Sequence, residues 1–320
     1  MCSSTLIGAY ISTFIAGHNG MVGQAVLRAG IEQGQDLLTA NRADLDLQNS
    51  HEVSIFLRKH KPTSVVLAAA KVGGIYANLS NKRKFLSENL QIQNSVILGA
   101  LDAGVKKFVF LGSSCIYPKL ATQPMQEDSL LTGPLETTNE GYALAKISGV
   151  KLCQYIREET GLDYFSLMPT NLYGPGDNFD AENSHVPAAL IRKFYGAKTS
   201  KAPSVKIWGS GNAMREFMHV YDLADAIWFA LEKPPAENLI NVGFGSEISI
   251  GDFARKIAKI ASFHGDLEFD TSMPEGTPRK LLDSTKFFEM GWRPKISLDT
   301  GLESTYKWFL ENIESEQCEL

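Results

Sequence analysis

Three residues near the middle of the chain have the types and the spacing to move protons. Tyr142 and Lys146 stand four positions apart, so on a helix the phenol and the ammonium would share one face. A nearby ammonium favours a phenolate, so we expect Lys146 to lower the pKa of Tyr142 from its ordinary value of about 10. The Ser113 hydroxyl could hold a carbonyl oxygen against that phenol. Together these groups would move a proton on or off a sugar or alcohol oxygen while a nicotinamide moves a hydride.

Cys115 adds a second kind of chemistry to this group. It stands two positions after Ser113, on the same face of the chain if the preceding strand continues that far. A thiol beside a carbonyl carbon could remove a proton from carbon; otherwise Cys115 is a small buried core residue. The other cysteines, Cys2, Cys153 and Cys318, show no Cys-x-x-Cys or metal-ligand spacing. We therefore expect free thiols in a reducing cytosol, with no disulfide framework and no metal site.

A glycine pattern upstream predicts a nucleotide site. Gly17, Gly20 and Gly23 follow an apolar strand over residues 12–16 and precede a helix. Such glycines let the backbone approach a pyrophosphate, and the N-terminus of the following helix favours its negative charge. A tight turn alone would also need glycine, but the position between a strand and a helix favours a dinucleotide.

The end of the second predicted strand indicates which dinucleotide binds. Enzymes that use NAD often carry an acid at this point, which binds the ribose 2′-hydroxyl. This chain has Asn41 and Arg42 instead, and a guanidinium can bind a 2′-phosphate that an acid would repel. We therefore expect NADP, unless Arg42 is only a solvated surface charge.

The order of the predicted elements gives the fold class. Strands are predicted over residues 12–16, 36–40, 64–69, 108–111, 164–167, 205–208 and 239–242. Helices are predicted over residues 24–29, 50–59, 86–103, 142–160, 186–194, 219–231 and 250–262, and a loop over residues 274–280. Alternating apolar strands and helices predict an α/β fold with a doubly wound parallel sheet of Rossmann type. The later elements predict a smaller, interleaved C-terminal substrate-binding lobe.

This order also suggests where the domains divide. We expect an NADP-binding domain over residues 1–173 and 217–243. The substrate-binding domain would comprise residues 174–216 and 244–320.

Composition argues against several classes of protein. Of 320 residues, 44% are hydrophobic and 21% charged, and the net charge of −5 gives no sign of nucleic-acid binding. No run of about 18 apolar residues is present, so we expect no membrane-spanning helix. We expect a cytoplasmic protein in which the residues before about Tyr10 form a loose tail.

Several longer segments resemble one enzyme family. They cover residues 16–23, 111–119, 168–175, 177–179, 183–186, 208–211, 214–217 and 276–283. Through them the chain resembles the extended short-chain dehydrogenase/reductase family, and within it the enzymes that epimerise and reduce a GDP-linked 4-keto sugar. One departure is Asn19, because the glycine loop of relatives often carries an arginine there.

The resemblance implies a substrate, a cofactor and residue roles. The substrate would be GDP-4-keto-6-deoxy-D-mannose, inverted at C3 and C5 and then reduced at C4 with NADPH. The implied catalytic residues are Ser113, Cys115, Tyr142, Lys146 and His185. The implied cofactor contacts are Gly17, Gly20, Met21, Val22, Gly23, Asn41, Arg42, Ala69, Tyr142, Lys146, Pro169, Asn171, Leu172 and His185. The implied substrate contacts are Ser114, Asn171, Arg192, Lys193, Trp208, Arg215 and Lys280.

Two other functions remain open at this point. A nucleotide-sugar 4-epimerase or 4,6-dehydratase of the same family would keep bound NAD, although a dehydratase typically needs an acid where this chain has Cys115. A non-catalytic NADP sensor would tend to lose Tyr142 or Lys146. Relatives pair two helices per subunit, which implies a homodimer held by a four-helix bundle of residues 86–103 and 142–160. We expect neither a nucleic-acid partner nor a membrane partner.

Overall fold

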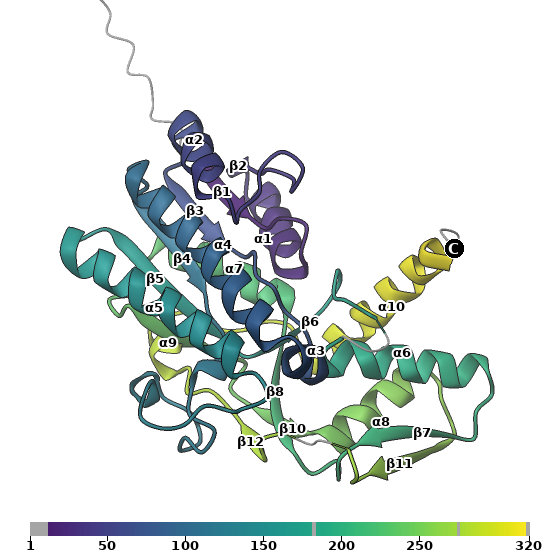
Figure 1. Cartoon of the computed structure of the whole chain (residues 1–320). Helices are drawn as coiled ribbons and strands as arrows, with labels where there is room; N and C mark the ends of the chain where they lie inside the picture. The colour runs from purple at the N-terminus through teal and green to yellow at the C-terminus, as the bar shows by residue number, and fades with distance from the viewer. Residues whose placement is uncertain (1–11, 181–183, 274–275, 318–320) are drawn as a thin grey trace, which may run out of the picture.

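Six parallel strands form the sheet that positions most of the predicted site. The computed structural model describes residues 12–180, 184–273 and 276–317. The strand order is β2-β1-β3-β4-β5-β9 (Figure 1). The strands are β1 (Ser12–Ala16), β2 (Asp36–Leu38), β3 (Ser64–Leu67), β4 (Lys107–Leu111), β5 (Asp163–Pro169) and β9 (Leu239–Val242). The order reverses between β1 and β3, which is where ligands bind in open sheets of this kind.

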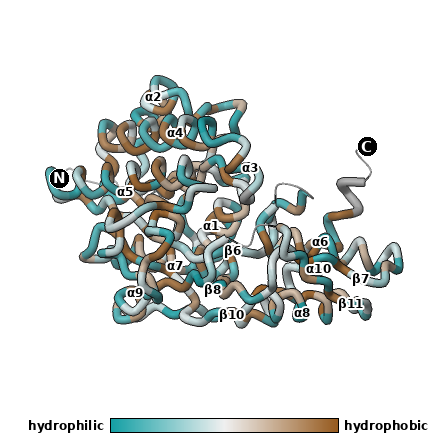
Figure 2. Tube along the Cα trace, turned by 60° about the horizontal axis from the view of Figure 1, so that its bottom comes forward, coloured by the Kyte–Doolittle hydropathy of each residue, from teal (hydrophilic) through white to brown (hydrophobic). Residues whose placement is uncertain are grey.

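Helices cover both faces of this sheet (Figure 1). One face packs against α2 (Ser50–His60), α4 (Lys82–Asp102) and α5 (Glu140–Thr160), and the other against α1 (Met21–Glu32) and α7 (Val220–Glu232). Within β3, Val65 and Leu67 belong to the first core and Val66 to the second, because successive side chains of a strand point to opposite faces. Hydrophobic stretches run along α4, α5 and α7 (Figure 2). The predicted doubly wound sheet is confirmed.

A smaller part of the molecule is built on two further sheets. In one, the central strand β8 (Met214–His219) pairs with β6 (Asn171–Tyr173), β10 (Glu247–Ser249) and β12 (Arg279–Lys280). In the other, β7 (Ser204–Trp208) pairs with β11 (Asp266–Asp270). A third core joins these strands to α6 (Val186–Thr199), α8 (Ile250–Ile260) and α10 (Leu298–Gln317). The remaining short elements are α3 (Ile75–Ser80), α9 (Thr285–Glu289) and the 3₁₀ turns η1 (Ser114–Ile116) and η2 (Glu127–Ser129).

The chain passes repeatedly between the two parts, which confirms the predicted interleaving. Thr170 separates β5 of the large sheet from β6 of the small one. Its N–H donates to Val242 O at 3.1 Å, and its hydroxyl donates to Glu216 O at 3.2 Å. This single residue therefore joins the two sheets.

Some predicted boundaries are corrected. The second strand ends at Leu38 and not at residue 40. The predicted loop over residues 274–280 contains the strand β12, which exists because Arg279 and Lys280 pair with Met214 and Arg215. The predicted N-terminal tail lies outside the described residues. None of the described helices is long and apolar enough to cross a membrane.

Candidate active site

The glycine loop has the shape of a dinucleotide site. Gly17 has φ of +95°, and a Cβ added there would lie 2.5 Å from Ala69 N. At Gly23 an added Cβ would lie 2.0 Å from Gly17 O, whereas one added at Gly20 would lie 3.7 Å from the same oxygen. Gly20 caps α1 without a side-chain hydrogen bond, so the first N–H groups of the helix remain available for an anion. The loop therefore fits a pyrophosphate, with Met21 and Val22 in the first turn of the helix.

Replacement of Gly23 by alanine should strongly weaken NADPH binding. The new methyl would collide with backbone atoms of the loop, which cannot move aside as a side chain can, so the loop must open. Gly196→Ala is the matched control, because an added Cβ there meets nothing within 4 Å. On α6 this control should be neutral or stabilising by about 0.4–1 kcal/mol. Fluorescence titration with NADPH measures the effect, and equal affinities for the two variants would contradict it.

The residues expected to select the cofactor lie just after β2. Asn41 and Arg42 are both exposed. Asn19 Nδ2 donates to Asn41 Oδ1 at 3.2 Å, which ties the glycine loop to this turn. The structure therefore places Asn41 next to the loop, with Arg42 beside it in the chain.

Lys146 is held at the base of the site. It is 4% exposed, and its Nζ donates to Leu111 O, the end of β4, at 2.7 Å. Nζ lies 5.7 Å from the centroid of the Tyr142 ring, so the two side chains do share one face of α5. Burial lowers the pKa of Lys146 to about 8, against an opposing effect of Cys115.

The phenol of Tyr142 differs from its predicted state. Burial raises the pKa of Tyr142, and the Cys115 thiol raises it further. The prediction that Lys146 lowers this pKa is therefore wrong for this structure. The reason is that burial of the phenol itself dominates its pKa, while the Lys146 ammonium is directed at Leu111 O. Tyr142 is protonated, as a proton donor must be.

Ser113 and Cys115 lie on a turn and not on a strand. β4 ends at Leu111, and the 3₁₀ turn η1 follows Ser113, so the expected continuation of the strand is wrong. The Ser113 hydroxyl caps this turn by accepting from Cys115 N–H at 3.4 Å. This cap keeps the two side chains together all the same. Cys115 is 6% exposed, and Ser114 beside it is buried at 4%.

Cys115 and His185 respond to the same ammonium. Burial raises the pKa of the Cys115 thiol, while Lys280 has the largest opposing effect, followed by Ser113 and Lys146. His185 is the N-cap of α6, and the residue as a whole is exposed. Desolvation of its ring by the surrounding protein nevertheless lowers the pKa of His185, and the charge of Lys280 lowers it further. Lys280 thus acts electrostatically on a thiol and an imidazole that are far apart in the sequence.

The other predicted substrate contacts form two groups in the smaller part. At the end of β7, Lys193 Nζ lies 5.4 Å from the Trp208 ring centroid, and Trp208 is 45% exposed. Arg215 and Lys280 are partners in the pairing of β8 with β12. Arg192, on α6, instead donates from Nη1 to Phe179 O at 3.0 Å.

The predicted residues around β6 tie the two parts together. Asn171 Nδ2 donates to Glu216 O at 2.8 Å, and Leu172 pairs with Met218. Pro169 ends β5, where it pairs with Val242.

Sequence reasoning missed a set of buried polar residues behind the site. Glu216 and Asn241 are fully buried, and Gln123 is half-buried. A signal was present for Glu216, since an acid directly before the largely apolar stretch from Phe217 to Val220 needs a specific partner if it is buried.

Comparison with known proteins gives the family. A sequence profile of the NAD dependent epimerase/dehydratase family matches residues 13–243. Probable GDP-L-fucose synthase 1 of Oryza sativa is 52% identical over 302 residues, which cover 94% of this chain and 92% of that protein. GDP-L-fucose synthase of Escherichia coli is 49% identical over 310 residues, with 93% and 96% covered. A solved GDP-L-fucose synthetase from Naegleria fowleri, bound to NADP, has a TM-score of 0.87 at 28% identity and covers 95% of both chains. The chain belongs to the NAD dependent epimerase/dehydratase family.

Proposed function

We propose that this protein is a GDP-L-fucose synthase, a bifunctional epimerase and reductase. It converts GDP-4-keto-6-deoxy-D-mannose to GDP-L-fucose by inversion at C3 and C5 and NADPH-dependent reduction at C4. The observation that carries this proposal is the buried Cys115 thiol on the turn that Ser113 caps, with Lys280 acting electrostatically on both Cys115 and His185. A reductase alone needs Ser113, Tyr142 and Lys146, but it has no use for a second acid/base pair.

Inversion uses the acidity that the C4 ketone gives to the protons on C3 and C5. Cys115 removes a proton from one face of the sugar, and His185 supplies one to the opposite face. The hydroxyls of Ser113 and Tyr142 hydrogen-bond the C4 oxygen and stabilise the negative charge that develops there.

Reduction uses the same two hydroxyls. NADPH, when bound, supplies the hydride for C4. Tyr142, which burial keeps protonated, donates its proton to the C4 oxygen. Lys146 orients the nicotinamide ribose from its place against Leu111 O.

The remaining predicted contacts hold the two nucleotides. The glycine loop and Ala69 would hold NADP, Asn41 and Arg42 would bind its 2′-phosphate, and Pro169, Asn171 and Leu172 would contact its nicotinamide end. In the smaller part, Trp208 and Lys193 take the guanine end of the substrate. Arg192, Arg215 and Lys280 provide positive charge for its diphosphate. Accordingly, we assign residues 1–173 and 217–243 to NADP and residues 174–216 and 244–320 to the substrate.

The decisive experiment is incubation with GDP-4-keto-6-deoxy-D-mannose and NADPH, with NMR of the sugar product. We expect GDP-L-fucose and one NADPH oxidised per product. A 4-epimerase or dehydratase regenerates its cofactor, and an NADP sensor turns nothing over, so neither consumes NADPH. Similarity to UDP-glucose 4-epimerase of Thermotoga maritima, at 22% identity and a TM-score of 0.83, concerns the fold alone.

Arg42→Ala should erase most of the preference for NADPH over NADH. A charge-assisted contact with the 2′-phosphate is worth about 1.5–3 kcal/mol, or roughly ten- to a hundred-fold in affinity. Competitive titration of both cofactors measures the ratio. If the variant keeps the wild-type ratio, the preference comes from another part of the pocket. Arg58→Ala, at an exposed site on α2, is the matched control and should leave the ratio unchanged.

Two exposed helices carry the proposal of a homodimer. α4 and α5 pack together, and they expose Leu98, Leu144 and Tyr155 at 44%, 42% and 52%. A second copy would cover these side chains in a four-helix bundle. Leu98→Arg with Leu144→Arg should halve the mass measured by light scattering; an unchanged mass would place the interface elsewhere.

We also propose a cytoplasmic location, where the free thiols of Cys115 and Cys153 stay reduced.

A further inference from the structure

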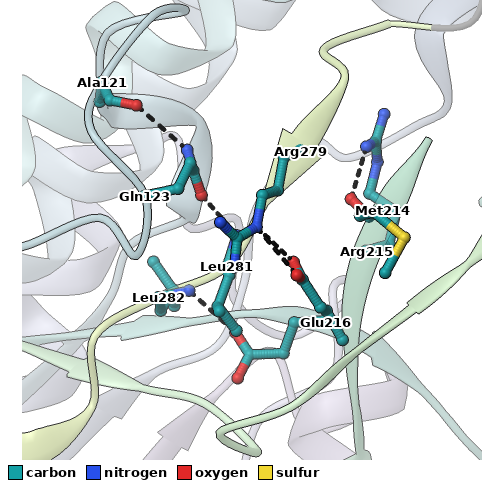
Figure 3. Close-up of polar contacts among 9 residues, drawn as sticks. Ala121, Gln123, Met214, Arg215, Glu216, Arg279, Leu281 and Leu282 are labelled. Atoms are coloured by element: carbon teal, nitrogen blue, oxygen red, sulfur yellow. Dashed lines mark hydrogen bonds and ion pairs between the residues drawn. The ribbon is translucent and has the colours of Figure 1, made fainter.

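Residues of other segments hydrogen-bond the backbone of the segment that follows Lys280. Leu281 N–H donates to Gln123 Oε1 at 2.9 Å, and Leu281 O accepts from Met125 N–H at 2.8 Å (Figure 3 shows the Gln123 contact). Leu282 N–H donates to Glu216 Oε2 at 3.1 Å. The next residue continues this pattern, since Asp283 N–H donates to Met125 O at 2.8 Å.

Glu216 is the one carboxylate in this arrangement that is completely buried, at 0% exposure. Its Oε1 accepts from Gly245 N–H at 2.7 Å, while its Oε2 holds Leu282. A Cβ added at Gly243 would lie 2.4 Å from Oε1, so this carboxylate is also tightly packed. Glu216 therefore fixes three segments relative to one another: β8, the loop after β9 and the chain after Lys280.

The short strand β12 sets the direction of Lys280. Neighbouring residues of a strand point to opposite faces. Arg279 Nε bonds both carboxylate oxygens of Glu247 at 2.9 Å on the exposed side. Lys280 must then point to the other side, where it interacts electrostatically with Cys115 and His185.

We propose that Glu216 is a positioning residue, which together with Gln123 holds the strand carrying Lys280 so that its ammonium faces the Cys115 thiol and favours the thiolate. This goes beyond a role of Lys280 in binding the diphosphate. It rests on the proposed function only for the use of that thiolate as a base, and its test needs no substrate.

The charges around these groups are consistent with this role. Burial raises the pKa of Cys115, and the ammonium of Lys280 is the largest influence that lowers it, ahead of Ser113 and Lys146. Burial lowers the pKa of Lys280, while the other groups acting on it are Cys115, Arg215 and Glu136. Burial raises the pKa of Glu216, opposed by the hydrogen bonds that Gly245 N–H and Leu282 N–H donate to its carboxylate.

The test is the pH dependence with which iodoacetamide alkylates Cys115 in the full-length protein, followed by mass spectrometry of the Cys115 peptide. Lys280→Met should raise the midpoint by about 1 pH unit, because an opposite charge nearby shifts a pKa by about 1–3 units. Glu216→Gln should raise the midpoint too, because its amide cannot accept from both N–H groups and the strand moves. Loss of a negative charge by itself would lower the midpoint, so the direction separates positioning from a direct electrostatic effect.

The matched control is Glu247→Gln, at the residue that pairs with Glu216 between β10 and β8. It should leave the midpoint unchanged, since Glu247 bonds only the exposed side of β12. A wild-type or lowered midpoint in Glu216→Gln would overturn the proposal, as would an equal rise in Glu247→Gln. If Glu216→Gln does not fold, Gln123→Leu removes the acceptor of Leu281 N–H at a half-buried site and should raise the midpoint. A wild-type profile there would overturn the proposal equally. Failure of the proposed function would appear separately, as wild-type protein that makes no GDP-L-fucose.

Discussion

Tyr142→Phe should slow the oxidation of NADPH in a single turnover by about 10²–10⁴-fold, the usual contribution of a general acid. The variant keeps the ring, whose edge-on contact with Phe85 has a centroid distance of 6.4 Å, and loses only the hydroxyl. Because burial raises the pKa of Tyr142, the phenol is protonated at neutral pH and can donate to the C4 oxygen. Stopped-flow measurement of NADPH oxidation with the keto sugar gives the rate.

Cofactor binding separates a chemical role of Tyr142 from a structural one. NADPH affinity should change little, because Lys146 and the glycine loop remain in place. Tyr155→Phe is the matched control, since Tyr155 lies on the same helix and is 52% exposed. It should retain the wild-type rate. Oxidation at a near-native rate by Tyr142→Phe would show that another group is the acid.

Cys115→Ser should block inversion at C3 and C5 while it spares reduction. A serine hydroxyl has nearly the size of the thiol but is a far weaker acid, so it cannot serve as a base near neutral pH. Formation of GDP-L-fucose should fall by about 10²–10⁴-fold. The ketone that has not been inverted can still be reduced, which would yield a different 6-deoxy sugar.

Incorporation of deuterium from the solvent tests this prediction. In D₂O the wild-type product should carry deuterium at C3 and C5, and the product of Cys115→Ser should not. His185→Gln should also prevent inversion. Cys153→Ser is the matched control, because Cys153 is a fully buried thiol on α5 that has no part in the proposed reaction. Wild-type rates of GDP-L-fucose formation by either site variant would remove that residue from the mechanism.

The large sheet was predictable from the sequence because its strands are short apolar runs that need no partner to be recognised. β1 was predicted with its observed bounds, Ser12–Ala16. The strands of the smaller part were harder. β8 mixes Arg215 and Glu216 with apolar residues, and β12 is only two residues long, so both depend on pairing with distant segments.

The candidate site, too, was predictable only where its geometry is local. Four-residue spacing was enough to place Lys146 beside Tyr142, because the geometry of a helix is local. The pKa of Tyr142 was predicted in the wrong direction, since burial depends on packing that spacing does not reveal. Glu216 and Gln123 were missed because each bonds the backbone of a residue far along the chain. The separation is 66 positions for Glu216 and 158 positions for Gln123.

The course of the chain through Thr170 limits how this enzyme can acquire a new sugar specificity. The polypeptide leaves the large sheet after β5, returns after β8 and leaves again after β9. A single recombination event therefore cannot graft the smaller part of one relative onto another. Such a chimera needs more than three junctions, because α9 packs again on the large sheet before α10 joins the smaller part, and the junction at Thr170 must preserve a hydroxyl that reaches Glu216 O. Stepwise point substitution is accordingly the simpler evolutionary route to a new sugar, and the more practical one for engineering.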